Sequence, residues 1–410
     1  MNRLKDILKT RRAPVYMAVL PSFYANTLTG LIPDLYAGLD VVSRELVGFI
    51  PTVNRSTSAE RAALNEAVKF HIAPAVAGVD IAPAMTVPEP ADVTVGNGSI
   101  TITKARAFPF GFAGEEQRGL NNGPGYLSVQ ADLFAQALRG IVNEMESDLA
   151  STAYLGASRA FGTSGTTPFA SDTDMTSQLK KILDDNGAPL SDRAFTIDTT
   201  AGAKLRTLLG INANRVAQDQ MTMQQGSLID LAGMVIGESA QVKTHTKGTG
   251  ASISTDATGY AVGSTSIALD ASTPAGTGTI VAGDVITFAG DANQYVVVTG
   301  DADASNGGTI VLQEPGLRVA IPAAETAITI TNSYTANVAY ARSAIGLVVR
   351  PPALPQEGDL ARDRMLITDP RSGMVFEVAI YPGYRKVRFE VAAAWGTKAI
   401  KPQHIALGKG

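Results

Sequence analysis

The strongest pattern of apolar and polar positions in this chain runs from about Ser128 to Leu155. Apolar side chains recur there at intervals of three or four residues, which is the spacing of one face of an α-helix. The apolar stripe consists of Phe134, Leu138, Ile141, Met145 and Leu149, and the charged residues off it are Arg139, Glu144, Glu146 and Asp148. At about 1.5 Å per residue this helix would be roughly 40 Å long. We therefore predict a structural spine with the stripe in the core.

Shorter patterns after this helix mix helix and strand. Helices are predicted near 174–186 and 200–209, because each places apolar residues on one face and ends at a glycine. Strands are predicted in AFTIDT (194–199), in GMVIGES (233–239) and in a β-meander from 373 to 407. In NVAYARSAIGLVV (337–349) we expect a helical turn followed by a strand. The predicted fold class is α+β.

Residues 61–112 are predicted to form an extended β-hairpin loop. EAVKFHIAP (66–74) and VTVGNGSITITKARAF (93–108) have strand composition, and the dipeptide Asn97-Gly98 indicates a tight turn. The hairpin has only a modest apolar face. Since an isolated two-stranded hairpin is marginally stable in water, we expect this arm to lie on a partner surface.

A segment from 246 to 337 differs in composition from the rest of the chain. It contains eight acidic residues and two basic ones, so its net charge is −6 and the remainder carries +2 of the overall −4. Short runs rich in Val, Ile and Thr alternate with Gly, Ala, Ser and Asp turns, which is typical of a small antiparallel barrel. We predict an all-β module, resembling a Greek-key barrel, inserted into a loop of the α+β host.

The overall composition favours a protein that is largely covered by copies of itself. Of 410 residues, 45% are hydrophobic, only 18% are charged, and 40 are glycine; there is no cysteine. No apolar run approaches the ~20 residues of a membrane span. The basic N-terminus MNRLKDILKTRR lacks the apolar segment of a secretory signal, so we predict a cytoplasmic protein. The first 12 residues fit an amphipathic helix, favoured as a docking arm over one that touches nucleic acid or an acidic membrane.

No catalytic or metal-binding pattern is found. His71, His245 and His404 are scattered, and none has a ligand partner three or four residues away. Nucleophile-elbow, P-loop and dinucleotide fingerprints are missing. The loop DADASNGGT (301–309) begins like a calcium loop, but Asn306 and Leu312 stand where Gly and Glu are required, so we expect a hairpin turn. We predict no enzyme, no catalytic residues, no cofactor and no metal.

Positive charge gathers near the C-terminus, where two partners remain open: nucleic acid, bound without base specificity, or acidic patches of neighbouring subunits. The residues are Arg385, Lys386, Arg388, Lys398, Lys401 and Lys409.

The order of these elements resembles the tailed-bacteriophage major capsid (coat) proteins, whose fold the herpesvirus capsid floor shares. More narrowly it is similar to the Salmonella short-tailed-phage type, which carries an inserted β-barrel. The matching stretches, in order, are FTIDTTAGAKLRTLLG (195–210), GSLIDLAGMVIGES (226–239), GDVITFAG (283–290), NVAYARSAIGLVVRPPALP (337–355) and VRFEVAAAWGTKAIKPQHIALG (387–408). The resemblance covers most of the chain from about residue 45.

The resemblance implies a division into an N-terminal arm (1–60), the hairpin loop and the start of a peripheral domain (61–112), the spine helix and peripheral domain (113–160), a central domain (161–245), the inserted barrel (246–337), and the return of the central domain with a closing β segment (338–410). It also suggests that Lys69, Arg106, Arg385 and Lys386 make charge contacts between subunits.

The function implied is a structural protein that assembles as pentamers and hexamers into an icosahedral shell around double-stranded DNA. Its partners would be copies of itself, a scaffolding protein, a portal protein, a decoration protein in some shells, and the packaged DNA through non-specific charge; no membrane is implied. Its location would be the virion capsid, built in the cytoplasm of the host bacterium. The alternatives are a β-rich surface or tail adhesin that binds a receptor, and then an enzyme with a β-rich accessory domain.

Overall fold

A computed structural model describes residues 47–72, 78, 83, 96–121, 126–213, 230–271, 276–370 and 372–410. The architecture is α+β, which confirms the predicted fold class. The predicted helix over residues 1–12 and most of the N-terminal arm lie outside the described residues.

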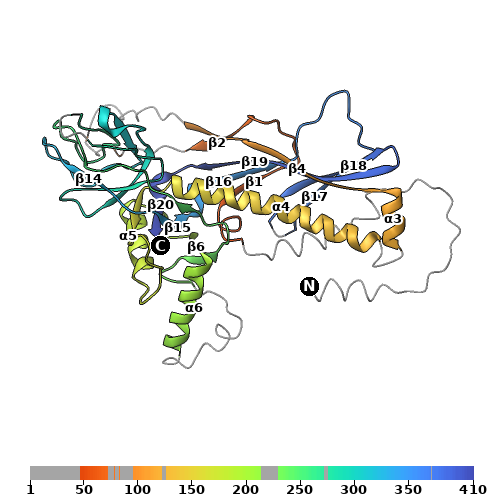
Figure 1. The fold of residues 1–410 in the computed structure, drawn as a ribbon, viewed down its shortest axis with the longest axis horizontal. Coiled ribbons are helices and arrows are strands. Elements are labelled where there is room, and N and C mark those ends of the chain that lie inside the picture. The colour runs from red at the N-terminus through yellow and green to blue at the C-terminus, as the bar shows by residue number, and fades with distance from the viewer. Residues whose placement is uncertain are drawn as a thin grey trace.

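One long helix crosses the molecule, α4 (Tyr126–Leu155), with the short α3 (Gly114–Asn121) at its N-terminal end (Figure 1). The structure places the whole predicted stripe in the core, since none of its five side chains is more than 1% exposed. Aromatic rings fix one end of the helix, because Phe134 packs edge-on to Phe110 and Phe389, with ring centres 4.8 and 5.6 Å away. The helix therefore lies along a sheet, with its apolar face turned inward.

That sheet has six strands, and β19 (Lys386–Ala399) forms its centre. β4 (Lys104–Ala113) pairs with one edge of β19. β16 (Ile345–Arg350) and β18 (Val375–Gly383) both pair with the other edge of β19. β17 (Asp363–Thr368) extends the sheet beyond β18, and β1 (Asn54–Thr57) runs parallel to β16.

A second sheet has twelve strands and begins with the order β7-β6-β15-β20-β5. These strands are β7 (Val235–Glu238), β6 (Arg193–Ile197), β15 (Tyr334–Ala341), β20 (Ile405–Lys409) and β5 (Arg159–Phe161). α5 (Asp174–Asp185) and α6 (Thr199–Ala213) pack on it through a separate apolar cluster. α5 confirms the helix predicted near 174–186, whereas α6 continues through Gly210, at which the second helix was predicted to end.

The same sheet continues into the strands of the acidic segment. β12 (Gln294–Thr299) pairs with β5, and the other strands are β9 (Ile253–Ser254), β10 (Ser266–Ala268), β11 (Val285–Phe288), β13 (Thr309–Leu312) and β14 (Ala327–Ile330). They enclose an apolar cluster of their own that includes Ile267, Ile286, Tyr295 and Ile310. The chain enters at β8 (Thr244–His245) and returns at β15, and these two strands pair. The predicted boundary at 337 thus falls inside β15.

One short prediction differs from the structure. The segment predicted as a helical turn then a strand is strand β15, a single 3₁₀ turn η3 (Arg342–Ala344) and strand β16. Alanines obscured the strand, because small residues suit a strand buried on both faces as well as a helix. The hairpin turn predicted for the calcium-like loop is confirmed, because this loop joins the antiparallel strands β12 and β13 and contains the 3₁₀ turn η2 (Ala304–Asn306). Another 3₁₀ turn, η4 (Pro402–His404), precedes β20.

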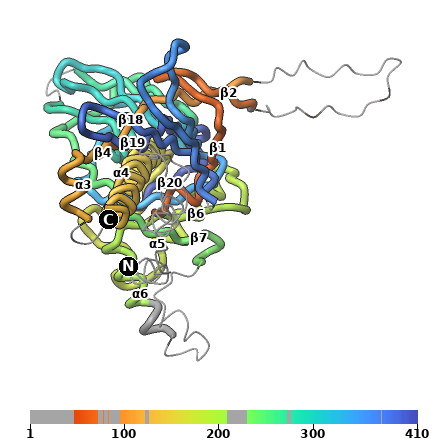
Figure 2. The backbone as a smooth tube through the Cα atoms, turned by 90° about the vertical axis from the view of Figure 1, so that its right-hand side faces the viewer, coloured from red at the N-terminus to blue at the C-terminus, as the bar shows by residue number. Residues whose placement is uncertain are grey.

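The hairpin strands β2 (Ala67–Ile72) and β3 (Gly96–Thr101) form a separate two-stranded sheet. Figure 2 shows them at the outer edge of the body, away from α4. Ile100 is buried against Val348 and Ala394 of the large sheet, whereas Lys69 and His71 are exposed. Only one face of the hairpin therefore rests on its own subunit.

Candidate functional site

Four features of the described residues stand out, and each is a contact surface or a junction between elements. They contain no group of three or more His, Cys, Asp or Glu side chains arranged to hold a metal ion. Within the same part of the chain, no helix is long and apolar enough to span a membrane. The features that remain are the hairpin, the seat of the N-terminal segment, the junction of the barrel with its host, and one polar groove.

The turn predicted at Asn97-Gly98 is wrong, because both residues lie inside strand β3. Asn97 pairs with His71, and its Oδ1 lies 2.9 Å from the His71 Nδ1. Gly98 lies under the ring of Phe70, where an added Cβ would come within 2.3 Å of the ring. The glycine is needed there for close packing across the strands and not for a turn. The connection between β2 and β3 falls mostly outside the described residues.

The four cations predicted to contact neighbouring subunits have different surroundings. Arg106 is engaged within its own chain, since its Nε and Nη2 donate to the Glu144 carboxylate over 3.2 and 3.0 Å. Arg106 therefore already has a partner within its own subunit, and its contact with a neighbour stays a prediction. Lys69 is exposed on β2, and Arg385 and Lys386 are exposed where β18 turns into β19. Those three remain available to a partner.

A buried carboxylate that sequence reasoning placed on the outer face holds the N-terminal segment. Glu146 is fully buried, and its two oxygens accept the backbone N–H groups of Gly48, Phe49 and Ile50 over 2.6, 2.8 and 3.0 Å. Burial raises the pKa of Glu146, and these hydrogen bonds oppose the rise. One spine side chain thus fixes the point from which the N-terminal arm departs.

A signal for Glu146 was present in the sequence. Val142, Ala150 and Ala153 lie at helical spacing around it and are buried too, so they form a second apolar stripe beside the first. A lone carboxylate inside an apolar stripe indicates a buried acceptor for backbone donors.

The barrel joins its host around a buried histidine–aspartate pair. His245 Nε2 lies 2.9 Å from Asp284 Oδ1, and Asp284 also accepts the N–H groups of Gly248 and Val281. The rings of Tyr154, on the spine helix, and Tyr334, on β15, flank the imidazole at 6.0 and 5.2 Å. The sequence showed only that His245 has no ligand partner three or four residues away, and it gave no sign of this arrangement. The pair ties the stem of the barrel to both the spine and the central sheet.

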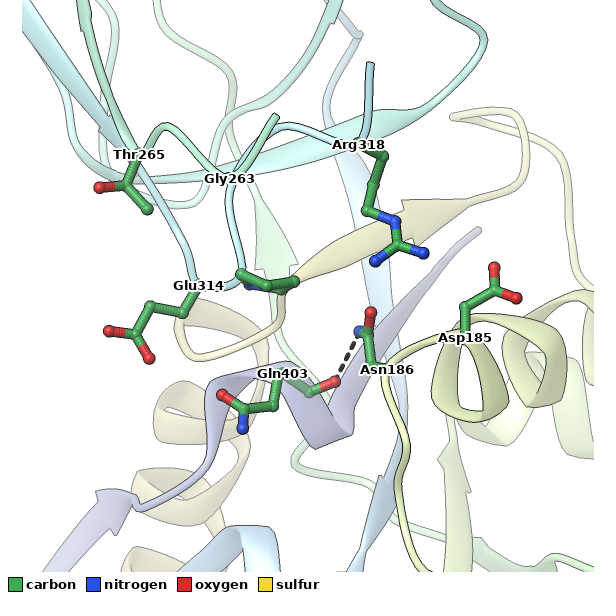
Figure 3. Close-up of a pocket in the computed structure, with 8 residues that line it drawn as sticks. Asp185, Asn186, Gly263, Thr265, Glu314, Arg318 and Gln403 are labelled. Carbon is green, nitrogen blue, oxygen red and sulfur yellow. Dashed lines mark hydrogen bonds between the residues drawn. The ribbon is translucent and has the colours of Figure 1, made fainter. Parts of the chain in front are cut away.

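A polar groove of about 550 Å³ lies between the barrel and the host (Figure 3). From the barrel it is lined by Gly263, Thr265, Glu314, Pro315 and Arg318, and from the host by Asp185, Asn186 and Gln403. Asn186 Nδ2 donates to the Gln403 backbone oxygen over 2.7 Å. Directly behind this wall, Arg159 is 5% exposed and donates to Asp185 and Asn186. No sequence motif marks the groove, since its residues come from four separate stretches of the chain.

Comparisons with known proteins found likenesses of structure alone. No protein-family model and no curated protein sequence matches the chain. A chain of Mycobacterium phage Che8 is similar with a TM-score of 0.44 and 12% identity, covering 96% of this chain and 98% of that one. A capsid structure of the cyanophage P-SCSP1u has a TM-score of 0.48 and 12% identity, covering 98% and 94%.

A mature capsid of bacteriophage PhiM1 has a TM-score of 0.45 and 10% identity, covering 97% of this chain and 91% of that one. These likenesses span whole chains at low similarity. The functional proposal is therefore built on the chain's own sequence and geometry.

Proposed function

We propose that this chain is a major capsid protein of the tailed-phage type, which assembles as pentamers and hexamers into an icosahedral shell around double-stranded DNA. The observation that carries the proposal is the β2–β3 hairpin, which has its own two-stranded sheet at the edge of the body. Val68 and Phe70 are half-buried and Lys69 and His71 exposed. Because such a hairpin gains little by burial in its own subunit, a neighbouring subunit completes it.

The order of elements supports the proposal. An N-terminal segment seated on the spine, an edge hairpin, a 30-residue helix, a central sheet, an inserted β module and a closing strand follow one another along the chain. This is the order on which the sequence resemblance to the coat proteins rests. A shell subunit needs complementary edges repeated with near-equivalent contacts, and it needs no reaction centre.

The inserted module, 246–337 in the proposed division, would stabilise the host domain and set contacts on the outside of the shell. Its separate apolar cluster supports independent folding, and the pairing of β8 with β15 closes the chain at its base. The narrower likeness to the Salmonella short-tailed-phage type belongs to this proposal, as do scaffolding, portal and decoration partners, assembly in the host cytoplasm, and a DNA-facing surface that acts by charge alone.

Sedimentation velocity of the purified chain, followed by hydrogen exchange, tests the proposal. We expect a large closed species beside a subunit of 42.7 kDa, with amides of β2 and β3 exchanging fast in the subunit and protected in the assembly. Equal protection in both states would mean that the hairpin belongs to an intramolecular core. An adhesin would give a small oligomer at every concentration.

A further inference from the structure

The groove between barrel and host contains a cation that is not neutralised. Arg318 is exposed, and among the described residues its guanidinium has neither a hydrogen bond nor an ion pair. Asp185 already accepts from Arg159 over 3.4 Å. In Figure 3 the Glu314 carboxylate points away from Arg318. The two acidic side chains of the lining therefore leave Arg318 open to an outside anion.

A second guanidinium lies close enough to Arg318 to be affected by its charge. Arg159 lies behind the lining, and its buried Nε has no acceptor. Burial lowers the pKa of Arg159, and the charge of Arg318 lowers it further. These two guanidinium groups repel each other across the groove wall. A carboxylate bound beside Arg318 would offset that repulsion.

Two exposed valines adjoin the groove residues along the chain. Val262 and Val319, the chain neighbours of the lining residues Gly263 and Arg318, are 61% and 46% exposed. The two segments that carry them are joined by a hydrogen bond from the Gly263 N–H to the Leu317 oxygen over 2.7 Å. A ligand that suits this place combines a carboxylate with an aliphatic group.

The chain carries such a combination on the loop between β16 and β17. Leu360 is 87% exposed, and three residues earlier Glu357 is exposed with no partner among the described residues. The loop is anchored, because the Asp359 carboxylate is held by Arg364, by the Tyr381 hydroxyl at 3.1 Å and by the Ala361 N–H at 3.0 Å. Because the turn is anchored, less conformational entropy is lost when its leucine binds a partner than would be lost by a free loop.

We propose that the 355–360 loop of one copy docks at the barrel–host groove of a neighbouring copy, with Glu357 against Arg318 and Leu360 covering Val262 and Val319. Figure 1 shows β14 of the barrel at one end of the long axis and β17 and β18 toward the other, so the two surfaces suit a head-to-tail contact between copies. Contacts of that kind close into rings when the rotation allows it. The inference rests on the proposed function and names one of its subunit contacts.

Charge reversal tests the pairing. Arg318→Glu and Glu357→Arg should each raise the protein concentration needed for assembly by roughly tenfold, since close charge pairs at interfaces couple by at least that factor. The double variant should recover most of this loss. Lys181→Glu and Glu325→Arg, at exposed positions on α5 and on the barrel, are the matched controls and should assemble as the wild type does. Circular dichroism confirms that each variant folds.

Cysteine cross-linking gives a second readout, because the chain contains no cysteine. In the double variant Arg318→Cys with Glu357→Cys, a bismaleimide long enough to span an arginine–glutamate pair should join the two thiols into covalent ladders of subunits in assembled material, and each single variant should not. Single reversals without effect, a double variant as impaired as the worse single, or no ladders from assembled double-cysteine protein would overturn the contact while leaving the shell function intact. A wild type that forms no assembly would overturn the proposed function, and the contact with it.

Discussion

The indole nitrogen of Trp395 donates a hydrogen bond to Oδ2 of Asp148 over 2.9 Å. Trp395 is fully buried on β19, and Asp148 lies on the spine helix. The other oxygen of this carboxylate accepts Lys104 Nζ, from β4, over 2.7 Å. One carboxylate thus joins the helix to two strands of the large sheet, and it holds the only tryptophan of the chain in place.

Replacing Asp148 by Ala should cost about 1–3 kcal/mol of the free energy of unfolding, because it leaves the buried indole N–H without an acceptor. The single tryptophan reports on this site directly, so urea unfolding followed by its fluorescence is the measurement. Asp132→Ala, at an exposed position of the same helix, is the control and should change stability by less than about 0.5 kcal/mol. Equal effects at both positions would remove Asp148 from the helix–sheet junction.

A charge in the middle of the apolar stripe should prevent folding. Ile141 is fully buried on α4, so Ile141→Asp loses apolar burial and buries an unpaired carboxylate. Together these should lower the free energy of unfolding by about 3–5 kcal/mol. Glu144→Lys is the comparison, since the Glu144 side chain is 31% exposed and loses only its pair with Arg106, worth at most about 1 kcal/mol. Soluble yield and thermal unfolding measure both. Similar losses would show that the helix is not one-sided.

Glu146→Gln should weaken the seat of the N-terminal segment. In the wild type both oxygens of Glu146 accept backbone N–H groups. The glutamine amide keeps one acceptor oxygen and turns its N–H₂ donor toward these N–H groups, so we expect the free energy of unfolding to fall by about 1–3 kcal/mol. Limited proteolysis around residues 48–50 should become faster than in Glu144→Gln, the control on the same helix. Unchanged proteolysis would mean that other contacts hold this segment.

Glu146 also predicts a pH dependence. Because burial raises its pKa in the folded state, the folded chain retains a proton that the unfolded chain has released in the interval above the ordinary glutamate pKa. The contribution of Glu146 to the free energy of unfolding is therefore fully present below the ordinary glutamate pKa. It is lost as the pH rises through the raised pKa of the folded state. Glu146→Gln has no such titration, so the stability difference between wild type and variant should change across this interval.

Lys409 predicts the opposite slope at alkaline pH. It is 2% exposed on β20, and burial lowers its pKa from 10.5 to about 8. Between these values the unfolded chain binds the proton and the folded chain does not, so the contribution of Lys409 to stability rises with pH from about 8 to about 10.5. Lys409→Met removes this contribution. The stability of the wild type relative to the variant, from urea midpoints at pH 7.5 and 10.5, should therefore increase; a constant difference would contradict the burial of the amine.

Periodicity predicted the elements that bury one continuous face. The stripe from Phe134 to Leu149 and the α5 pattern are local signals, because a helix must turn its apolar side chains inward whatever it packs against. The same logic failed at 337–349, since alanine suits both a helix and a strand covered on two faces. It also failed at Asn97-Gly98, where the glycine accommodates the ring of Phe70 across the hairpin and makes no turn.

Contacts between distant segments could not be read from local patterns. Glu146 is buried because residues 48–50 bring three N–H groups to it across nearly a hundred positions. The groove at Arg318 exists only once the barrel lies beside α5 and η4. The apolar spacing around Glu146 indicates a buried acceptor but not which segment supplies its donors, and the residues of the groove carry no spacing signal.

The central claim is that the chain closes into a shell, and electron microscopy of the purified full-length protein tests it most directly. Images of material at increasing protein concentration should show closed particles of uniform curvature, or sheets and tubes built from hexamers where closure fails. A field of small, monodisperse oligomers at every concentration, with and without a co-expressed scaffolding protein, would contradict the account.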